Sequence, residues 1–284
     1  MTESTFGTLI ETTVRVVSWN IWWRFGPWEA RQPAIIETLR RLDPDIVCLQ
    51  EVWIDLATGE SSAHRIAAAL GWDAAHIALG NRADLDGLGF GNAVISRWPV
   101  TSSETAPLFS PADLEEHRVV VRADIDGPRG PLQVFTTHLH WRYDHSSIRQ
   151  EQVGDVCRFV ASSPDRSFPA VLTGDFNADP ASDEIRLLTG RAAVPAPPLV
   201  FFDAWEVAGE GDGATWSNDN PFAVRDLEIT RRIDFVFAGY PKQGGAGHVV
   251  AVDLVGVQPV AVGDPPAPAI VPSDHYGVVA DLRY

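Results

Sequence analysis

A short apolar segment of the chain ends in Gly174, Asp175, Phe176 and Asn177, which brings a carboxylate close to an amide. The apolar run before them, residues 170–173, lies between a proline and a glycine and is too short for a helix, so it predicts a buried strand that feeds a loop. Side chains alternate across a strand, which would place Asp175 and Asn177 on one face and Phe176 in apolar packing. A carboxylate that accepts a proton and an amide that donates to an anion would then be neighbours. An Asx turn that caps the strand is the alternative interpretation.

Other polar side chains recur where the sequence predicts that strands end. They are Asn20, Glu51, His138, Asp274 and His275. Sites in α/β sheets are built at strand ends, so these residues are candidates for a shared site. Two of them have simpler alternatives. Glu51 is also suited to capping the turn that follows it, and a lone histidine such as His138 is often a structural hydrogen-bonding group.

Alternating, β-branched segments predict the strands that would carry these residues. At least eight strands are expected, over residues 14–20, 45–51, 118–124, 132–138, 170–173, 232–237, 249–255 and 278–282. Apolar residues at helical spacing predict helices over 28–42, 61–70, 146–160 and 182–188. The glycines of residues 87–91 are assigned to tight turns, because no helix follows them. With no repeat and no interdomain linker in view, we expect one α/β domain over 1–284, with residues 1–12 as a flexible N-terminal segment.

The charge of the chain limits its partners. The formal net charge is -16, and a single lysine, Lys242, stands against 21 arginines. A broad basic surface of the kind that grips nucleic acid is therefore not expected, and long polyanions are disfavoured partners. A local arginine-lined cavity and the recruitment of divalent cations are compatible with this charge.

Cysteine usage and hydropathy point to an ordinary soluble protein. Cys48 and Cys157 both lie among apolar residues, which predicts small buried side chains rather than ligands or a disulfide. The N-terminus lacks the pattern of a signal peptide, and no apolar run reaches the roughly 18 residues of a membrane span. A cytoplasmic monomer is the default expectation.

The strand-end residues lie in local sequences that follow one another in a familiar order. These are Ser18-Trp19-Asn20, Leu49-Gln50-Glu51, residues 92–97, Thr137-His138-Leu139, Gly174-Asp175-Phe176-Asn177, Arg232-Ile233-Asp234 and Ser273-Asp274-His275. This series resembles the endonuclease/exonuclease/phosphatase superfamily of deoxyribonuclease I-like enzymes over nearly the whole chain. The resemblance implies a four-layer α/β sandwich, in which two packed, mostly antiparallel β-sheets are flanked by helices. It also implies a metal-dependent phosphoesterase.

The resemblance assigns a role to each matching residue. The implied catalytic residues are His138, Asp175, Asn177, Asp234 and His275. Asp175 would orient or deprotonate the attacking water, and Asp234 would hold the ring of His275, so that the imidazole can carry positive charge against the transition state. The implied metal ligands are Asn20, Glu51 and Asp274, whose oxygen atoms suit one or two Mg²⁺ or Mn²⁺ ions.

Two further residues are implied to contact the substrate, and each has an alternative. Arg118 would bind a phosphate oxygen, unless it is a surface arginine on an edge strand. Trp216 would line the substrate site, unless it is a core tryptophan. Some DNA-repair members carry an acidic residue where this chain has Trp22, which suggests an apolar wall near the site.

A phosphodiesterase acting on a small or lipid-derived phosphate ester is the function that these features favour. An endonuclease or exonuclease is the alternative within the same enzyme class, with four tryptophans available to stack on the bases of single strands: Trp22, Trp23, Trp141 and Trp216. A non-catalytic binding or scaffold protein on the same fold is the third hypothesis.

Overall fold

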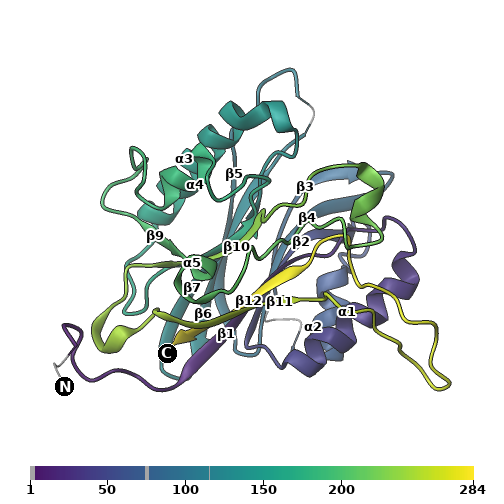
Figure 1. Ribbon diagram of the computed structural model, residues 1–284, viewed down its shortest axis with the longest axis horizontal. Coiled ribbons are helices and arrows are strands. Elements are labelled where there is room, and N and C mark those ends of the chain that lie inside the picture. Colours follow the sequence, from purple (N-terminus) through teal and green to yellow (C-terminus); the bar gives the residue numbers. More distant parts are fainter. Residues whose placement is uncertain (1–3, 74–76, 115) are drawn as a thin grey trace.

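Two six-stranded β-sheets pack face to face at the centre of the molecule (Figure 1). The computed structural model describes residues 4–73, 77–114 and 116–284. The first sheet has the order β11-β12-β1-β2-β4-β3, with the bounds β1 Thr13–Asn20, β2 Ile46–Asp55, β3 Ile77–Leu85, β4 Leu88–Ser96, β11 Val249–Val255 and β12 Gly277–Arg283. The second sheet has the order β5-β6-β7-β8-β10-β9, with the bounds β5 Val100–Pro107, β6 Val119–Gly127, β7 Gly130–His138, β8 Val171–Asp175, β9 Phe201–Asp203 and β10 Asp234–Gly239.

Most neighbouring strands of the described chain run antiparallel. The exceptions are one pair near the middle of each sheet, because β1 is parallel to β2 and β7 is parallel to β8. In both pairs the strand ends meet at one edge of the sheet, which is where sites in α/β proteins form. The prediction of two packed, mostly antiparallel sheets is confirmed.

Helices cover the outer faces of both sheets and complete four layers (Figure 1). The helix bounds are α1 Trp28–Leu42, α2 Ser62–Ala69, α3 Ser146–Ser162, α4 Asp183–Leu188 and α5 Ala204–Ala208. The first two pack on the first sheet, and α3 and α4 pack on the second. The short α5 contacts β10 and β11 at the side of the sandwich. The predicted four-layer architecture is therefore confirmed.

Alternation along the strands divides the apolar core into layers. Val16 on β1 belongs to the cluster between the two sheets, whereas its neighbour Val17 belongs to the cluster beneath α1 and α2. The same division occurs in the second sheet, where Val134 faces the other sheet and Phe135 packs against α3. Because successive strand side chains point to opposite faces, strands covered on both sides need apolar residues at consecutive positions. Cys48 and Cys157 are free and buried in these layers, as predicted.

Four strands, β3, β4, β5 and β9, and one helix were not predicted, for identifiable reasons. Strand β5 is an exposed edge strand of mostly polar residues, so it lacks an apolar pattern. Strand β9 has three residues and α5 has five, which is too short for a periodic signal. Strand β3 ends in a polar segment and pairs with β4 through the turn at Gly87. Of the glycines assigned to turns, Gly89 and Gly91 instead lie within β4.

The segment predicted to be flexible at the start of the chain makes contact with the rest of the fold. Ile10 N–H donates to Gly244 O at 2.9 Å, so part of this segment is hydrogen-bonded to the turn before β11.

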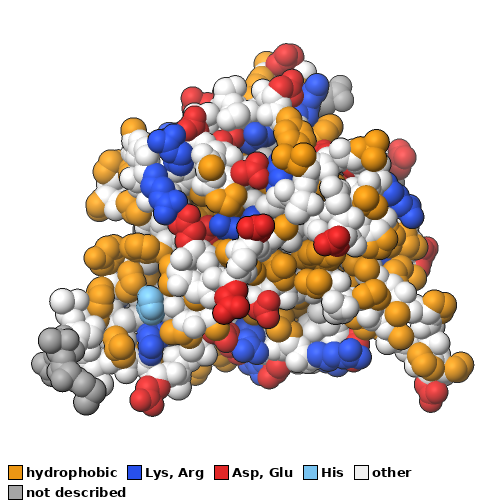
Figure 2. All heavy atoms as spheres, viewed as in Figure 1, with side chains coloured by type: hydrophobic (Ala, Val, Ile, Leu, Met, Phe, Trp, Pro, Cys, Tyr) orange, Lys and Arg blue, Asp and Glu red, His pale blue; other side chains and the backbone are white. Residues whose placement is uncertain are grey.

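None of the helices in the described residues has the length and apolar character needed to cross a bilayer. On the face drawn in Figure 2, the described Lys and Arg side chains lie in small separate groups, interspersed with acidic ones.

Candidate active site

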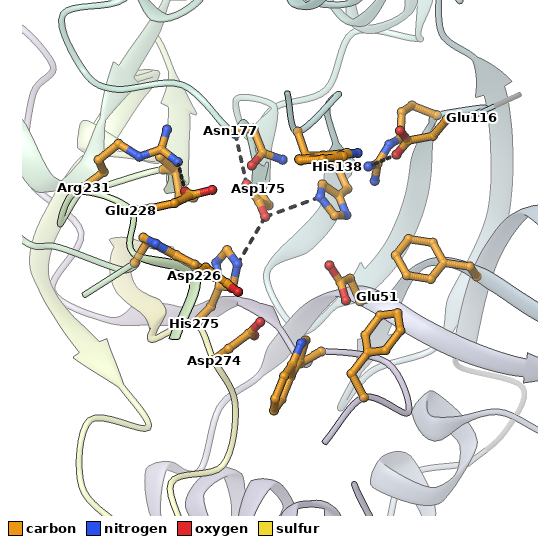
Figure 3. Close-up of a pocket in the computed structure, with 17 residues that line it drawn as sticks. Glu51, Glu116, His138, Asp175, Asn177, Asp226, Glu228, Arg231, Asp274 and His275 are labelled. Carbon is orange, nitrogen blue, oxygen red and sulfur yellow. Dashed lines mark hydrogen bonds and ion pairs between the residues drawn. The ribbon is translucent and has the colours of Figure 1, made fainter. Parts of the chain in front are cut away.

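A cavity of about 540 Å³ opens at the edge where the central strands of both sheets end (Figure 3). Its charged and imidazole side chains are Glu51, Glu116, Arg118, His138, Asp175, Asp226, Glu228, Arg231, Asp274 and His275. Its aromatic walls are Trp22, Phe25, Phe90, Trp141 and Trp216. Most of the predicted site residues therefore surround one cavity, and the exceptions, Asn20 and Asp234, lie directly behind its wall.

Sheet register brings three of the site residues together. Asp175 is the register partner of His138 on β7 and of Asp234 on β10. His138 Nε2 lies 3.4 Å from Asp175 Oδ2, and His275 Nε2 lies 3.8 Å from the same oxygen (Figure 3). The other ring nitrogen of His275, Nδ1, lies 2.9 Å from Asp234 Oδ2. The Asp175 carboxylate is thus flanked by two imidazoles, one of which a second carboxylate holds in place.

Burial and neighbouring charge give these groups distinct protonation states. Burial and the charge of Asp234 raise the pKa of Asp175 to about 7. Burial lowers the pKa of His275, but the carboxylates of Asp234 and Asp175 outweigh burial and raise that pKa well above its ordinary value. Burial and the nearby Arg118 charge lower the pKa of His138 well below its ordinary value. At neutral pH His275 is therefore cationic and His138 is neutral.

The turn after β8 depends on Gly174 and on Asp175 itself. Gly174 adopts a φ of 151°, and a Cβ atom there would lie 2.2 Å from the carbonyl oxygen of Thr137. Asn177, with a φ of 49°, donates its backbone N–H to Asp175 Oδ1 at 2.9 Å. The Asn177 side chain also donates, from Nδ2 to the carbonyl of Leu139 at 3.1 Å. The Asx turn and the site residue are thus the same structure, so the two interpretations of this segment are compatible.

Glu51 lies within β2 and not at its end, which corrects the sequence-based placement. The apolar residues after Glu51 continue the strand to Asp55, and the pairing with β4 shifts register between Leu49 and Val52. Glu51 itself has a φ of 54°, a strained conformation for a residue with a side chain. The bulge lets the strand continue while the Glu51 side chain lines the cavity.

Asn20 supports two carboxylates from behind the cavity. Its Nδ2 donates to Glu51 Oε1 and to Asp175 Oδ2, each at 3.1 Å. Its Oδ1 accepts the backbone N–H of Trp22 at 3.0 Å. The side-chain oxygen that was predicted to bind a metal is thus engaged by the backbone, and the amide links Glu51 to Asp175.

The donor set around Glu51 fits a divalent cation. Glu51 Oε2 is buried and makes no hydrogen bond within the described chain. Burial raises the pKa of Glu51. Burial and the negative charge of Glu51 raise the pKa of Asp274 to about 7. Glu51 and Asp274 are thus two buried carboxylates whose neighbouring positive charges do not offset the effect of burial. Carboxylate oxygens are the ligands that Mg²⁺ and Mn²⁺ prefer.

A second group of potential ligands lies beside it. Ligand atoms of Asp175, Asp234 and His275 all lie within 4.8 Å of one another. The Nδ1 atom of His275 already pairs with Asp234, and a protonated imidazole cannot bind a metal. His275 is thus engaged by Asp234 through a hydrogen bond and by Asp175 through an ion pair at 3.8 Å, whereas Glu51 Oε2 has no partner among the described residues.

One buried arginine fixes the loops on either side of the metal-ligand candidates. The Arg31 guanidinium donates to the carbonyls of Ile21, Trp22 and Phe25 after β1, and to the carbonyl of Pro272 just before Asp274. It lies 4.6 Å from the centroid of the Trp22 ring. Arg31 on α1 thus links the segment after Asn20 to the segment before Asp274.

The two predicted substrate contacts both line the cavity. Arg118 forms an ion pair with Glu116, and its Nε and Nη1 atoms make no hydrogen bond within the described chain. The Trp216 ring centroid lies 5.0 Å from that of His275, in an edge-on arrangement. Arg118 is buried, so the surface-arginine alternative is wrong. Trp216 lines the cavity and also packs in a small buried cluster with Ala223 and Ile233, so it is a core residue that reaches the site.

Several lining residues were missed in the sequence. Asp226, Glu228 and Arg231 form a polar wall, and Phe25 and Phe90 form part of the aromatic wall. For Arg231 the sequence did offer a signal, because this residue directly precedes the segment Arg232-Ile233-Asp234, which was assigned to the site. The others lie in loops or face a cavity that only the packing of the two sheets creates.

Comparisons with known proteins agree with this geometry. Among curated proteins, the chain is 29% identical over 212 residues to "Protein angel" of Drosophila melanogaster, which covers 69% of this chain and 57% of that protein. It is 25% identical over 260 residues to the inositol phosphosphingolipids phospholipase C of Schizosaccharomyces pombe, which covers 79% of this chain and 59% of that protein. The chain thus spans less than two thirds of the length of either relative.

A solved structure and a family match cover nearly the whole chain. The endonuclease/exonuclease/phosphatase from Beutenbergia cavernae has a TM-score of 0.68 and 27% sequence identity, and the match covers 96% of this chain and 72% of that one. Residues 17–275 match the Endonuclease/Exonuclease/phosphatase family. Because this match extends from β1 to the histidine before β12, and so includes the strands that carry the cavity's acidic and imidazole groups, the chain belongs to the endonuclease/exonuclease/phosphatase family of phosphoesterases.

Proposed function

We propose that this protein is a phosphodiesterase that uses Mg²⁺ or Mn²⁺ to hydrolyse a small or lipid-derived phosphate diester. The observation that carries the proposal is the position of Asp175. Its carboxylate lies between His138 and His275 at distances of 3.4 and 3.8 Å, and Asn20 links it to Glu51. A base, a cationic donor and a place for a divalent cation thus converge on one cavity.

Glu51 and Asp274 would hold the cation, and Asn20 would keep Glu51 in place. A bound divalent cation would withdraw charge from a phosphate oxygen and make the phosphorus easier to attack. Asp175 is free to act on water, because its own hydrogen bonds come from Asn20 and from the backbone of Asn177. The carboxylates that would bind the cation, Glu51 and Asp274, are therefore different from the one that would move a proton, Asp175.

The residues then account for each proton in the reaction. Asp175 takes a proton from water as the water oxygen bonds to phosphorus. The bond to the leaving alcohol breaks, and the His275 imidazolium gives that oxygen a proton. The proton on Asp175 can return to His275, whose Nε2 atom is 3.8 Å away. His138 and Asn177 line the cavity and would contact the phosphate oxygens. Asp234 keeps the His275 ring oriented through Nδ1.

The size and charge of the protein favour a small substrate. A cavity of about 540 Å³ with five aromatic side chains suits a compact or partly apolar ester. A net charge of -16 disfavours long polyanions such as duplex DNA. The similarity to a phospholipase C from Schizosaccharomyces pombe, an enzyme named for phosphosphingolipids, supports a lipid-derived ester.

The proposal is tested with bis-p-nitrophenyl phosphate in the presence of Mg²⁺, Mn²⁺ or EDTA. We expect hydrolysis with either metal and loss of hydrolysis with EDTA, and activity that is indifferent to chelation would contradict the metal mechanism. Asp175→Asn and His275→Ala should each lower the rate about 100-fold or more. Near-normal rates in these folded variants would remove Asp175 and His275 from the mechanism, whereas no hydrolysis by the unmodified protein with either metal would favour a binding or scaffold protein.

A nuclease is the competing function, and the exposed Trp141 is the feature that favours it. Its side chain is 56% exposed at the cavity, where it could stack on an unpaired base. Plasmid and single-stranded DNA are incubated with the protein at concentrations that cleave the small diester. Intact DNA under these conditions supports the small-ester assignment, and efficient cleavage of single strands would replace it.

A further inference from the structure

Glu116 lines the cavity beside Arg118 and has no part in the mechanism above. It lies in the loop that leads into β6, and one oxygen of its carboxylate pairs with Arg118 Nη2. The other oxygen, Oε2, lies 3.2 Å from Nε2 of His140, which follows β7. Because β6 and β7 are antiparallel neighbours, the start of β6 and the end of β7 meet at one edge, and Glu116 joins them there.

The surroundings of His140 hold the Glu116 carboxylate in place. Nδ1 of His140 accepts the backbone N–H of Arg142 at 3.4 Å, so the ring proton is on Nε2 and is donated to Glu116. The backbone N–H of His140 donates to Gln152 on α3 at 3.0 Å, which fixes the position of the ring. Burial lowers the pKa of His140 and outweighs the opposing effect of Glu116, so the ring is neutral at neutral pH. Of these two partners of Glu116, only Arg118 therefore brings a positive charge.

Cationic groups that line the cavity are paired with carboxylates. The pairs are Arg118 with Glu116, Arg231 with Glu228, and His275 with Asp234. Figure 3 shows Arg231 and Glu228 on the side of Asp175 opposite Glu116. Each pair cancels its own charge, so none of the three adds an excess positive charge that would favour a doubly charged phosphate.

The number of charges on the phosphate then decides how strongly Glu116 opposes a substrate. A phosphate diester carries one negative charge, whereas a monoester carries nearly two at neutral pH. Coulomb repulsion is proportional to charge, so a carboxylate beside the arginine that would bind the phosphate repels a monoester about twice as strongly as a diester.

We propose that Glu116 determines specificity by disfavouring phosphate monoesters relative to diesters. The proposal rests on the proposed phosphodiesterase function and names the residue that selects the class of phosphate ester. Glu116 acts through its charge on Arg118 and on the substrate, and it does not touch the reacting atoms. Repulsion of the wrong ligand is a general source of specificity, because discrimination depends on the difference between two binding free energies.

The test compares bis-p-nitrophenyl phosphate with p-nitrophenyl phosphate, which share one leaving group, at about pH 8 with Mg²⁺ or Mn²⁺, where the monoester carries two negative charges. We expect the unmodified protein to have the higher kcat/KM for the diester. Glu116→Gln keeps the length of the side chain and removes its charge, so the ratio of diester to monoester kcat/KM should fall about tenfold. Glu116→Asp keeps the charge, and its ratio should stay closer to that of the unmodified protein. A purely structural role would lower both kcat/KM values and leave their ratio unchanged.

Two variants that remove the same charge elsewhere provide controls. Asp144→Asn changes a side chain that is 71% exposed and lies outside the cavity lining, so the ratio should not change. Glu228→Gln removes a carboxylate from the opposite wall and should move the ratio less than Glu116→Gln does. An unchanged ratio in Glu116→Gln, or an equal fall in either control, would overturn the role of Glu116 alone. If the unmodified protein cleaves neither ester with either metal, or prefers the monoester, the phosphodiesterase proposal itself fails.

Discussion

Asp175 and Asp234 are register partners on neighbouring strands, and the His275 ring lies against both carboxylates. The two aspartates have different surroundings. Asp175 lines the cavity, whereas Asp234 lies behind it. Asp234 Oδ2 faces His275 Nδ1, and Asp234 Oδ1 makes no hydrogen bond with the described residues. One carboxylate is therefore placed to meet substrate, and the other is placed to hold a histidine.

Replacement of Asp234 by asparagine tests this arrangement. Asp234→Asn keeps the shape of the side chain but removes the charge opposite His275, so we expect kcat/KM for bis-p-nitrophenyl phosphate to fall about 100-fold or more. Steady-state kinetics and circular dichroism measure activity and folding in the same preparation. Asp281→Asn, which removes a surface partner of Arg15, is the control and should stay close to the unmodified rate. A rate for Asp234→Asn equal to that control would remove Asp234 from the mechanism.

Metal binding should depend on Glu51 and not on Asp175. Glu51→Gln removes the buried carboxylate charge, so Mg²⁺ or Mn²⁺ affinity should fall about tenfold or more. Asp175→Asn should retain most of the affinity while losing turnover, because its carboxylate is assigned to the proton. Isothermal titration calorimetry with each ion gives the affinities. The opposite result, with binding lost in Asp175→Asn and kept in Glu51→Gln, would reverse the two roles.

Arg31 should contribute strongly to stability. Its buried guanidinium donates to backbone carbonyls on both sides of the cavity wall, and Arg31→Met leaves those carbonyls without their donor. We expect the free energy of unfolding to fall by about 3 kcal/mol or more, measured by urea titration. Arg41→Met on the same helix, which removes an exposed pair with Glu37, should cost less than about 1 kcal/mol. Similar losses in both variants would argue against the role of Arg31.

Gly174 is expected to tolerate no side chain. In Gly174→Ala the new Cβ would lie 2.2 Å from the carbonyl oxygen of Thr137, in addition to the strain of a φ of 151°. We predict a loss of about 3 kcal/mol or more in the free energy of unfolding. Gly59→Ala, at a φ of 76° with open space around the new atom, separates backbone strain from collision and should cost only about 1 kcal/mol. Thermal and urea unfolding of both variants decide the comparison.

Asp124 should make stability depend on pH in the acid range. Burial by itself would raise the pKa of Asp124, but hydrogen bonds from Ser102 and Gln133 and the charge of Arg122 outweigh burial and lower it. A carboxyl with a lowered pKa in the folded state stabilises the protein above its unfolded pKa, and this contribution is lost as pH falls through the folded pKa. The stability difference between the unmodified protein and Asp124→Asn should therefore be largest near neutral pH and shrink as the pH falls through the ordinary carboxyl range, about pH 4, and below it. A difference that stays constant over this range would contradict the assignment.

Much of the fold was accessible from local patterns. The helix over residues 28–42 was predicted with the bounds that the structure shows, because its apolar stripe ends at an aspartate followed by proline. Strands buried on both faces, such as β1 and β7, were also found, since long β-branched segments have few other conformations. The exposed edge strand β5 carries no such pattern, and its existence depends on pairing with β6.

The candidate site likewise has features that the sequence predicts and features that only the tertiary structure shows. The sequence by itself determined the identities of the acidic and imidazole groups and their places at or near strand ends, because residue type and strand period are local properties. Only the tertiary structure decided that Glu51 sits on a bulge inside β2, that the Asn20 amide links Glu51 to Asp175, and that Arg231 and Glu228 line the same cavity. Those relationships join segments far apart in the chain, and they are set by sheet register and by the packing of two sheets, which no local sequence pattern encodes.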